Sequence, residues 1–386
     1  MGYVAVSGGA AAIEASLERL KYERLKRGLV LDVEAVQAGM RSLIDQVMSE
    51  ASLFDEHIAA LCIKQAEGSP EEAVFLMRAF RSTLPRLHYS LPVDTRVMTI
   101  DRRISASFKD IPGGQLLGAS CDYQHRLIDT SLIGERADEA KAWIAGYRAR
   151  TEPTDSGSRE EPRASPPAVG ATMNVESAID YVRELGLLEQ VPIDDTEPRD
   201  VTKRAIEFPT VRSERLQILT RGQTGALTAL GYAALRGYGA TLHPTVGELR
   251  VGRAGVLVPN PLAAPGAAGA STTSAEDAYY VGELELTVVE TLVPVQHKRG
   301  DGTAQVDFEL GFGASFGQNE TKTIAMSILD QCLESEDKRY PTQDEEFVLL
   351  HIDSVEASGF ISHLKLPHYV TFQSKLDALR KARASQ

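Results

Sequence analysis

Two histidines near the end of the chain have the spacing with the most chemical content. His363 and His368 lie five residues apart in Ser362–Tyr369, so they would not share a helix face, and Pro367 disfavours a helix there. In a turn, the two imidazoles could still converge on one ion. Because zinc takes about four ligands, the pair would supply half a site, and His351 or a partner protein would supply the rest. Two unrelated surface histidines are the alternative.

A second candidate site lies in the first half of the chain, where cations precede a glycine-rich turn. Arg102, Arg103 and Lys109 come shortly before Gly113 and Gly114. Glycine lets a backbone approach a phosphate closely, and the cationic side chains can bind its oxygens. On a strand without a bulge, Arg103 and Lys109 would lie on one face. The alternative is a solvated strand edge.

The composition argues against several classes of protein. The chain has 386 residues, of which 43% are hydrophobic and 25% charged, as in globular proteins. Its net charge of -13 argues against a broad nucleic-acid surface, which needs clustered Lys and Arg. No apolar run approaches the roughly 20 residues that cross a bilayer, so we expect no membrane association. Three widely separated cysteines and the lack of a signal-peptide pattern favour a reduced cytoplasm.

Helical patterns fill most of the first hundred residues. They begin after Gly9, after the N-cap Asp32, near Ser52 and at Pro70, and their apolar side chains recur at the spacing of one helix face. A short strand is expected over Ile104–Phe108, where apolar side chains alternate with serines.

The second half of the chain mixes strands with helices. Glu248–Val258 and Tyr279–Val293 are rich in β-formers, whereas Asn174–Leu188, an amphipathic Thr321–Leu333 and a basic Phe372–Ala384 follow helical patterns. We therefore expect an α+β fold, with a mostly helical N-terminal part that has short strands, and a C-terminal part of antiparallel strands and helices.

A change of composition divides the chain. Between residues 150 and 172, Pro, Ser, Glu, Arg and Gly replace any periodic pattern, which predicts a flexible, solvated linker. We therefore expect a helical domain over residues 1–149 and a mixed domain over residues 173–386, and the latter carries the two histidines.

Ordered blocks of unusual composition match one known family. The blocks are Arg102–Ala106, Lys109–Gly118, Asp122-Tyr123, His125–Leu127, Arg236–Gly239, His243-Pro244, Gly247-Glu248, Arg250, Gln343–Leu349, Val355–Ala357 and Ser362–Tyr369. With them the chain resembles the PhnI family of the carbon–phosphorus lyase system. The resemblance covers most of the chain but not residues 150–172 or 261–275.

The resemblance implies a subunit of the carbon–phosphorus lyase core complex that works beside PhnG, PhnH, PhnJ and PhnL. The family's reaction joins a phosphonate such as methylphosphonate to C1 of the ATP ribose and expels adenine, giving ribose 1-methylphosphonate 5-triphosphate. ATP would bring magnesium with it, and the isolated subunit would act as a nucleosidase on ATP or GTP. In this family the histidines that match His363 and His368 help hold zinc at the contact with PhnJ. The resemblance therefore places the metal and the partner contact in the C-terminal domain.

That reaction requires particular side chains. Displacing adenine from ribose passes through an oxocarbenium-like state, which a carboxylate stabilises while an acid protonates the departing base. Asp110 is our first choice for the carboxylate, Glu248 the second, and His125 the proton donor; the cations and glycines described above would hold the phosphates. The alternatives are a turn cap for Asp110, an exposed strand position for Glu248, and a surface or packed histidine for His125.

Two other functions compete with the leading interpretation. One is a non-catalytic scaffold that binds nucleotide and zinc while another subunit performs the chemistry. The other is a nucleoside hydrolase unrelated to phosphonates, which would need an Asp-rich calcium site near its N-terminus. The first fifty residues contain only Asp32 and Asp45, which argues against that second function.

Overall fold

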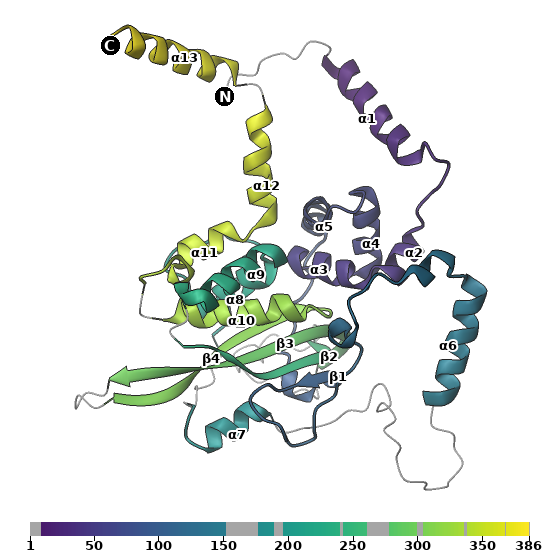
Figure 1. The fold of residues 1–386 in the computed structure, drawn as a ribbon, viewed down its shortest axis with the longest axis vertical. Helices are drawn as coiled ribbons and strands as arrows, with labels where there is room; N and C mark the ends of the chain where they lie inside the picture. Colours follow the sequence, from purple (N-terminus) through teal and green to yellow (C-terminus); the bar gives the residue numbers. More distant parts are fainter. Residues whose placement is uncertain are drawn as a thin grey trace.

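The fold combines helices with one antiparallel sheet (Figure 1). The computed structural model describes residues 9–151, 177–188, 196–239, 242–260, 278–298, 304–335, 338–366 and 368–385. The predicted α+β class is confirmed. The predicted linker at residues 150–172 lies outside the described residues, apart from Arg150 and Thr151 at the end of a helix.

The elements have the following bounds. The α-helices are α1 (Gly9–Leu25), α2 (Val33–Gly39), α3 (Arg41–Ala51), α4 (Glu56–Gln65), α5 (Pro70–Thr83), α6 (Ala137–Thr151), α7 (Ala178–Glu184), α8 (Arg212–Arg221), α9 (Thr224–Ala233), α10 (Glu320–Glu334), α11 (Glu345–His351), α12 (Ser354–Ser362) and α13 (Tyr369–Ala384). Shorter helical turns are η1 (Thr95–Val97), η2 (Cys121–Tyr123), η3 (Thr130–Gly134), η4 (Ala234–Tyr238), η6 (Pro341–Gln343) and η7 (His363–Lys365). The strands are β1 (Thr99–Ile104), β2 (Thr245–Pro259), β3 (Ala278–Lys298) and β4 (Ala304–Phe316).

The N-terminal helices correct two predicted boundaries. The helix expected after Asp32 is interrupted at Met40, where the backbone leaves the helical region and separates α2 from α3. The next helix begins at Glu56 and not near Ser52, because Ser52 takes a left-handed conformation at the end of α3. Asp55 then caps α4 by accepting the Ile58 N–H at 2.9 Å.

The sheet unites the two predicted parts of the chain. Its strand order is β1-β2-β3-β4 with antiparallel neighbours, so β1 from residues 1–149 pairs with β2 from residues 173–386. The strand expected over Ile104–Phe108 is wrong, since β1 lies upstream and ends at Ile104. β4 has no counterpart among the predicted strands, because glycines interrupt its pattern.

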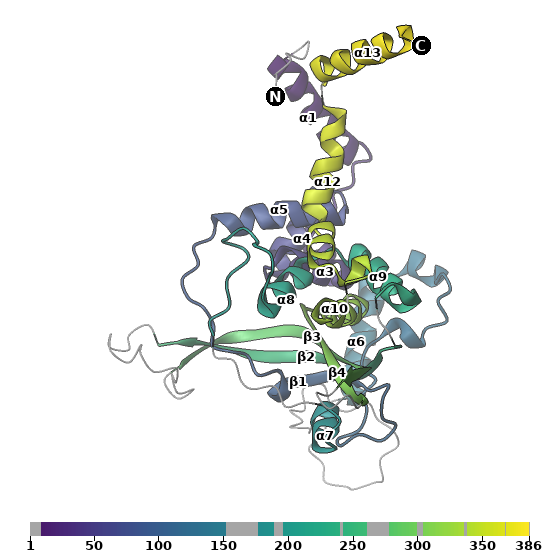
Figure 2. The same ribbon diagram turned by 90° about the vertical axis from the view of Figure 1, so that its left-hand side faces the viewer.

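Those glycines let α10 lie directly on the sheet. A Cβ at Gly311 would come within 2.1 Å of the Ser327 carbonyl oxygen, and one at Gly313 within 2.4 Å of the Thr323 carbonyl oxygen. The helix expected over Thr321–Leu333 is confirmed, and most of its polar side chains are buried along with the apolar ones. The sheet covers one side of α10 and α8 and α9 cover the other, so nearly all its side chains are buried (Figures 1 and 2).

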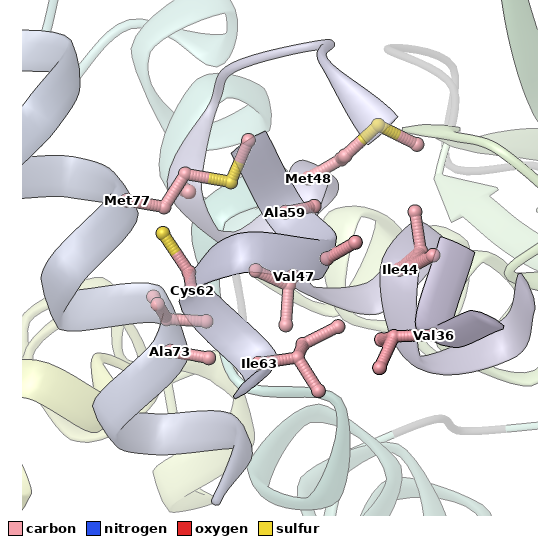
Figure 3. Packing of buried hydrophobic residues seen from close by; sticks show 12 residues of the cluster. Val36, Ile44, Val47, Met48, Ala59, Cys62, Ile63, Ala73 and Met77 are labelled. Atoms are coloured by element: carbon pink, nitrogen blue, oxygen red, sulfur yellow. The ribbon is translucent and has the colours of Figure 1, made fainter. Parts of the chain in front are cut away.

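A second core lies among α2, α3, α4 and α5. Figure 3 shows apolar side chains from all four helices converging, among them Val36, Ile44, Val47, Ile63 and Met77. Each of these five is at most 2% exposed. This core supports the side of the molecule on which α3 and α5 meet α8 and α12.

Helices at both ends of the described chain stand away from these cores. α1 and α13 bury no side chain, and the apolar stripe expected for the first helix is exposed, with Ile13 at 64% and Leu17 at 61%. The basic helix predicted over Phe372–Ala384 is confirmed as α13, which begins at Tyr369. Among the described residues, no helix is both long and apolar enough to span a bilayer.

Candidate functional site

The alternation of β1 sends its two arginines to opposite faces of the sheet. Arg103 pairs with Arg250 across β1 and β2, and Arg102 pairs with Val251, so successive side chains point to different sides. Arg102 lies on the side of α10, where it meets Glu320. The guanidinium groups of the two arginines predicted to bind phosphate therefore lie on opposite faces of the sheet.

Arg103 forms a buried ion pair with Glu248. Its Nε donates to Glu248 Oε1 at 2.5 Å, and the two side chains are 2% and 1% exposed. The other carboxylate oxygen accepts the Ser177 hydroxyl at 2.9 Å and the Ala178 N–H at 3.0 Å. Glu248, second choice for the reaction carboxylate, thus anchors the N-terminus of α7 and neutralises Arg103.

The glycine-rich turn also contacts Arg103. Gly113 and Gly114 have φ angles of 78° and 75°, which glycine adopts readily. The Arg103 guanidinium donates to the carbonyl oxygens of Pro112 at 2.5 Å and Gly114 at 3.2 Å. The predicted turn is confirmed, and its carbonyl groups face a cation. Phosphate binding at Arg103 would require these partners to be exchanged.

Arg102 ties the segment after this turn to α10. Its guanidinium donates to Asp122 at 2.7 Å and to the carbonyl oxygen of Leu117, and it lies 2.9 Å from Glu320. The ring of Tyr123 packs against the same guanidinium at 5.8 Å. Arg102 is 4% exposed, so it too is committed to protein partners in this structure.

The other predicted residues near this turn are exposed. Lys109 and Asp110 lie on the loop between β1 and the turn, and His125 lies on the exposed stretch after η2. These three side chains face solvent, where a ligand can reach them.

The structure shows a second ion pair on the same face of the sheet, which the sequence analysis did not predict. Arg250 and Glu290 lie 3.3 Å apart beside Glu248 and Arg103. Burial raises the pKa of Glu290, while the neighbouring Arg250 lowers it. The sequence carries a signal for this charged face. Residues 248 and 250 are charged and stand between apolar ones, and alternate positions share a strand face.

The histidines of the C-terminal segment lie side by side. His363 belongs to η7 and His368 precedes α13, and their ring centroids are 5.5 Å apart. His368 Nδ1 lies 2.6 Å from the Leu366 carbonyl oxygen, and His363 Nδ1 contacts that of Phe360. Because a carbonyl oxygen only accepts, both Nδ1 atoms carry the proton, and both Nε2 lone pairs remain for a metal.

His351 lies too far from this pair to share an ion with it. The nine-residue helix α12 separates His351 from His363, and nine residues of α-helix span about 13 Å. In the described part of the chain, no three His, Cys, Asp or Glu side chains are grouped as metal ligands would be. The pair therefore offers two ligands, and any others would come from elsewhere.

Comparison with known proteins accounts for the whole chain. The family described as "Bacterial phosphonate metabolism protein (PhnI)" matches residues 2–386. The chain is 41% identical over 396 residues to the "Alpha-D-ribose 1-methylphosphonate 5-triphosphate synthase subunit PhnI" of Rhizobium meliloti (strain 1021), covering 99% of this chain and 95% of the relative. The protein of the same name from Escherichia coli (strain K12) is 39% identical over 393 residues, covering 100% and 99%.

A third relative carries a different name. The "Putative C-P lyase subunit protein HtxH" of Stutzerimonas stutzeri is 40% identical over 387 residues, with 98% of this chain and 95% of the relative covered. The three alignments cover 98% or more of this chain and 95% or more of each relative. The chain belongs to the PhnI family of bacterial phosphonate metabolism proteins.

Proposed function

We propose that this chain is a subunit of the enzyme that makes ribose 1-methylphosphonate 5-triphosphate within the carbon–phosphorus lyase system. The observation that carries the proposal is the full-length similarity, at 39% and 41% identity, to two proteins named as subunits of that synthase. In this reaction the bond between ribose C1 and adenine N9 breaks, a bond from C1 to a phosphonate oxygen forms, and the departing adenine takes up a proton.

Exposed side chains of the first half are proposed to serve this chemistry. Asp110 would stabilise positive charge at C1, His125 would protonate adenine, and Lys109 beside the turn of Gly113 and Gly114 would hold phosphate oxygens. Their exposure supports these roles, since a substrate can reach them without displacing a protein partner. Magnesium would accompany the triphosphate.

Glu248 has a different role in this proposal. Its carboxylate is buried and fully engaged by Arg103, Ser177 and Ala178, so it is a positioning residue for the turn and for α7. Arg102, Arg103 and Glu248 are all engaged by protein partners, which supports the alternative function, a non-catalytic scaffold, because these side chains would have to exchange partners to contact substrate.

His363 and His368 are proposed to hold zinc together with a partner subunit of the PhnJ type. The support is geometric: the rings are adjacent, each Nδ1 is held by a carbonyl, and both Nε2 atoms are available. Zinc needs about four ligands, so a site of two imidazoles requires further ligands from outside this chain.

The test is adenine release from ATP in the presence of methylphosphonate. The complex with PhnG, PhnH, PhnJ and PhnL is assembled with wild-type chain, with Asp110→Asn, and with the exposed control Asp138→Asn. We expect Asp110→Asn to slow release about a hundredfold or more and the control to leave it unchanged. Adenine release that depends on the complex but is unchanged in Asp110→Asn would favour the scaffold function.

A further inference from the structure

The helices α3, α5, α8 and α12 come together on the side of α10 that faces away from the sheet (Figures 1 and 2), and the chain carries four arginines there. Arg78 and Arg81 are one turn apart on α5, Arg221 is the last residue of α8, and Arg86 follows α5. The carboxylates of Asp200 and Asp353 partly offset these four cations. The chain has a net charge of -13, so this local excess of positive charge is unusual for it.

The guanidinium group of Arg78 is engaged by protein contacts. It donates to Asp353 at 2.6 Å, to the Glu50 carbonyl oxygen at 2.8 and 3.0 Å, and to the Arg221 carbonyl oxygen at 3.0 Å. It therefore binds the C-terminal ends of both α3 and α8. Asp353 also caps α12 through the N–H groups of Val355 and Glu356.

Asp200 is similarly occupied. It pairs with Arg86 and accepts hydrogen bonds from the Thr202 N–H at 2.9 Å, the Thr202 hydroxyl at 2.6 Å and the Tyr89 hydroxyl at 3.3 Å. Both carboxylates of the cluster are thus committed to other groups.

Arg81 and Arg221 are left without a carboxylate partner within 4.0 Å among the described residues. Arg81 donates to the Ala51 carbonyl oxygen at 2.6 Å, and Arg221 makes one long contact of 3.4 Å to the Val201 carbonyl oxygen. The Nε of Arg221 is buried and, within the described part of the chain, has no hydrogen-bond partner. Both side chains keep part of their surface in solvent, so a ligand can reach them.

The electrostatics of the two groups agree with this geometry. Burial, followed by the charges of Arg78 and Arg81, lowers the pKa of Arg221 to about 10. Burial, followed by the charges of Arg78 and Arg86, lowers that of Arg81. Like charges held together out of water destabilise one another, and an anion would relieve that repulsion.

We propose that Arg81 and Arg221 form a binding site for an oxyanion of the phosphate class. Guanidinium groups suit such a ligand, because their planar N–H forks match pairs of phosphate oxygens. Phosphate, a phosphonate and the end of a triphosphate share this chemistry. The site does not depend on the proposed reaction, since the argument uses only unpaired cations.

The competing explanation is that Arg81 only caps the C-terminal end of α3 through Ala51. The two explanations predict different changes in the stability of the ligand-free chain. If Arg81 and Arg221 serve an absent anion, replacing either with Gln removes repulsion and leaves the ligand-free chain at least as stable at low salt. If they serve the fold, the same change lowers stability.

The experiment is calorimetric titration of the full chain at low salt with inorganic phosphate, methylphosphonate, tripolyphosphate and ATP. The variants are Arg81→Gln, Arg221→Gln and Arg221→Lys, and the charge-matched control is the exposed Arg136→Gln. Thermal unfolding of each ligand-free variant checks its fold and stability.

We expect at least one of these anions to bind, each Gln variant to weaken it roughly tenfold to a hundredfold, and the control to match wild type. Arg221→Lys keeps the charge without the fork and should fall in between. Equal affinity for tripolyphosphate and ATP identifies a triphosphate end, whereas binding of phosphate or methylphosphonate alone identifies a single oxyanion. The site is refuted if none of the four anions binds, or if both Gln variants, folded as judged by unfolding, retain wild-type affinity.

Discussion

At the scale of single residues, Glu248 shows how burial changes the role of a carboxylate. A buried ion pair that loses one partner leaves the other charge without compensation, which costs about 3–5 kcal/mol. Glu248→Gln should therefore lower the free energy of unfolding by about that amount, because Arg103 stays buried beside a neutral amide. Urea denaturation measures the change.

The exposed pair of Arg136 and Asp138 provides the control, since Asp138→Asn should change stability by less than about 0.5 kcal/mol. If Glu248→Gln kept wild-type stability and abolished adenine release, Glu248 would take part in the reaction and would not stabilise the fold.

Lys322 is the second residue with a measurable consequence. It is 1% exposed, and its Nζ donates to the Ser49 hydroxyl at 3.1 Å. Burial lowers its pKa to about 8, although Glu50 acts in the opposite direction. The folded chain thus releases this proton near pH 8, whereas the unfolded chain keeps it until about pH 10.5.

Between those values the unfolded state binds more protons, so this group adds stability as the pH rises. We predict that the unfolding free energy of wild type, relative to Lys322→Met, increases from about pH 8 towards pH 10.5 by on the order of 3 kcal/mol in full. Denaturant titrations at several pH values test this. A difference that is flat or falls with pH would show that folded Lys322 keeps its proton up to about pH 10.5, as in the unfolded chain.

At the scale of elements, the contact between α10 and β4 rests on the absence of side chains at Gly311 and Gly313. Gly313→Ala would force a methyl group against the Thr323 carbonyl oxygen, and overpacking of this kind costs about 1–3 kcal/mol or more. Gly255→Ala in β2 is the matched control, because its Cβ would meet Tyr280 at an ordinary 3.4 Å. Thermal unfolding should show a lowered midpoint for Gly313→Ala alone. Equal midpoints would mean that α10 can shift away from the sheet.

The helix α12 acts as a spacer. It holds the histidine pair away from α11, and side chains near the pair are exposed, including Phe360 at 77% and Val370 at 74%. Exposed apolar side chains gathered in one region are typical of surfaces that a partner protein covers. This arrangement fits the proposal that the remaining zinc ligands come from another subunit.

At the scale of the whole molecule, the zinc proposal predicts that metal content depends on assembly. The isolated chain should hold zinc weakly and the complex with a PhnJ-type partner tightly. His363→Ala and His368→Ala should each lower the zinc content of the purified complex, as measured by elemental analysis. His351→Ala is the control and should leave it unchanged, because α12 separates His351 from the pair. If both variants kept full zinc content, the two histidines would be surface residues and not zinc ligands.

Much of the architecture follows from local sequence patterns. Pro70 begins α5, Asp344 caps α11, and the β-rich stretches in the second half form β2 and β3. These features depend on neighbours a few residues apart, so periodicity and capping chemistry suffice to place them. The family also followed from the sequence alone, because its motifs are local and ordered.

Tertiary structure decided which charges meet. Arg103 and Glu248 are separated by 145 positions, and only the register of β1 against β2 brings them together. The same strand sends Arg102 to the opposite face, because β1 covers Thr99–Ile104 and so contains both arginines. Likewise, Arg81 and Arg221 gather because α5 and α8 both pack on α3. Composition gives the number of cations in the chain, but long-range packing determines which carboxylates are close enough to neutralise them.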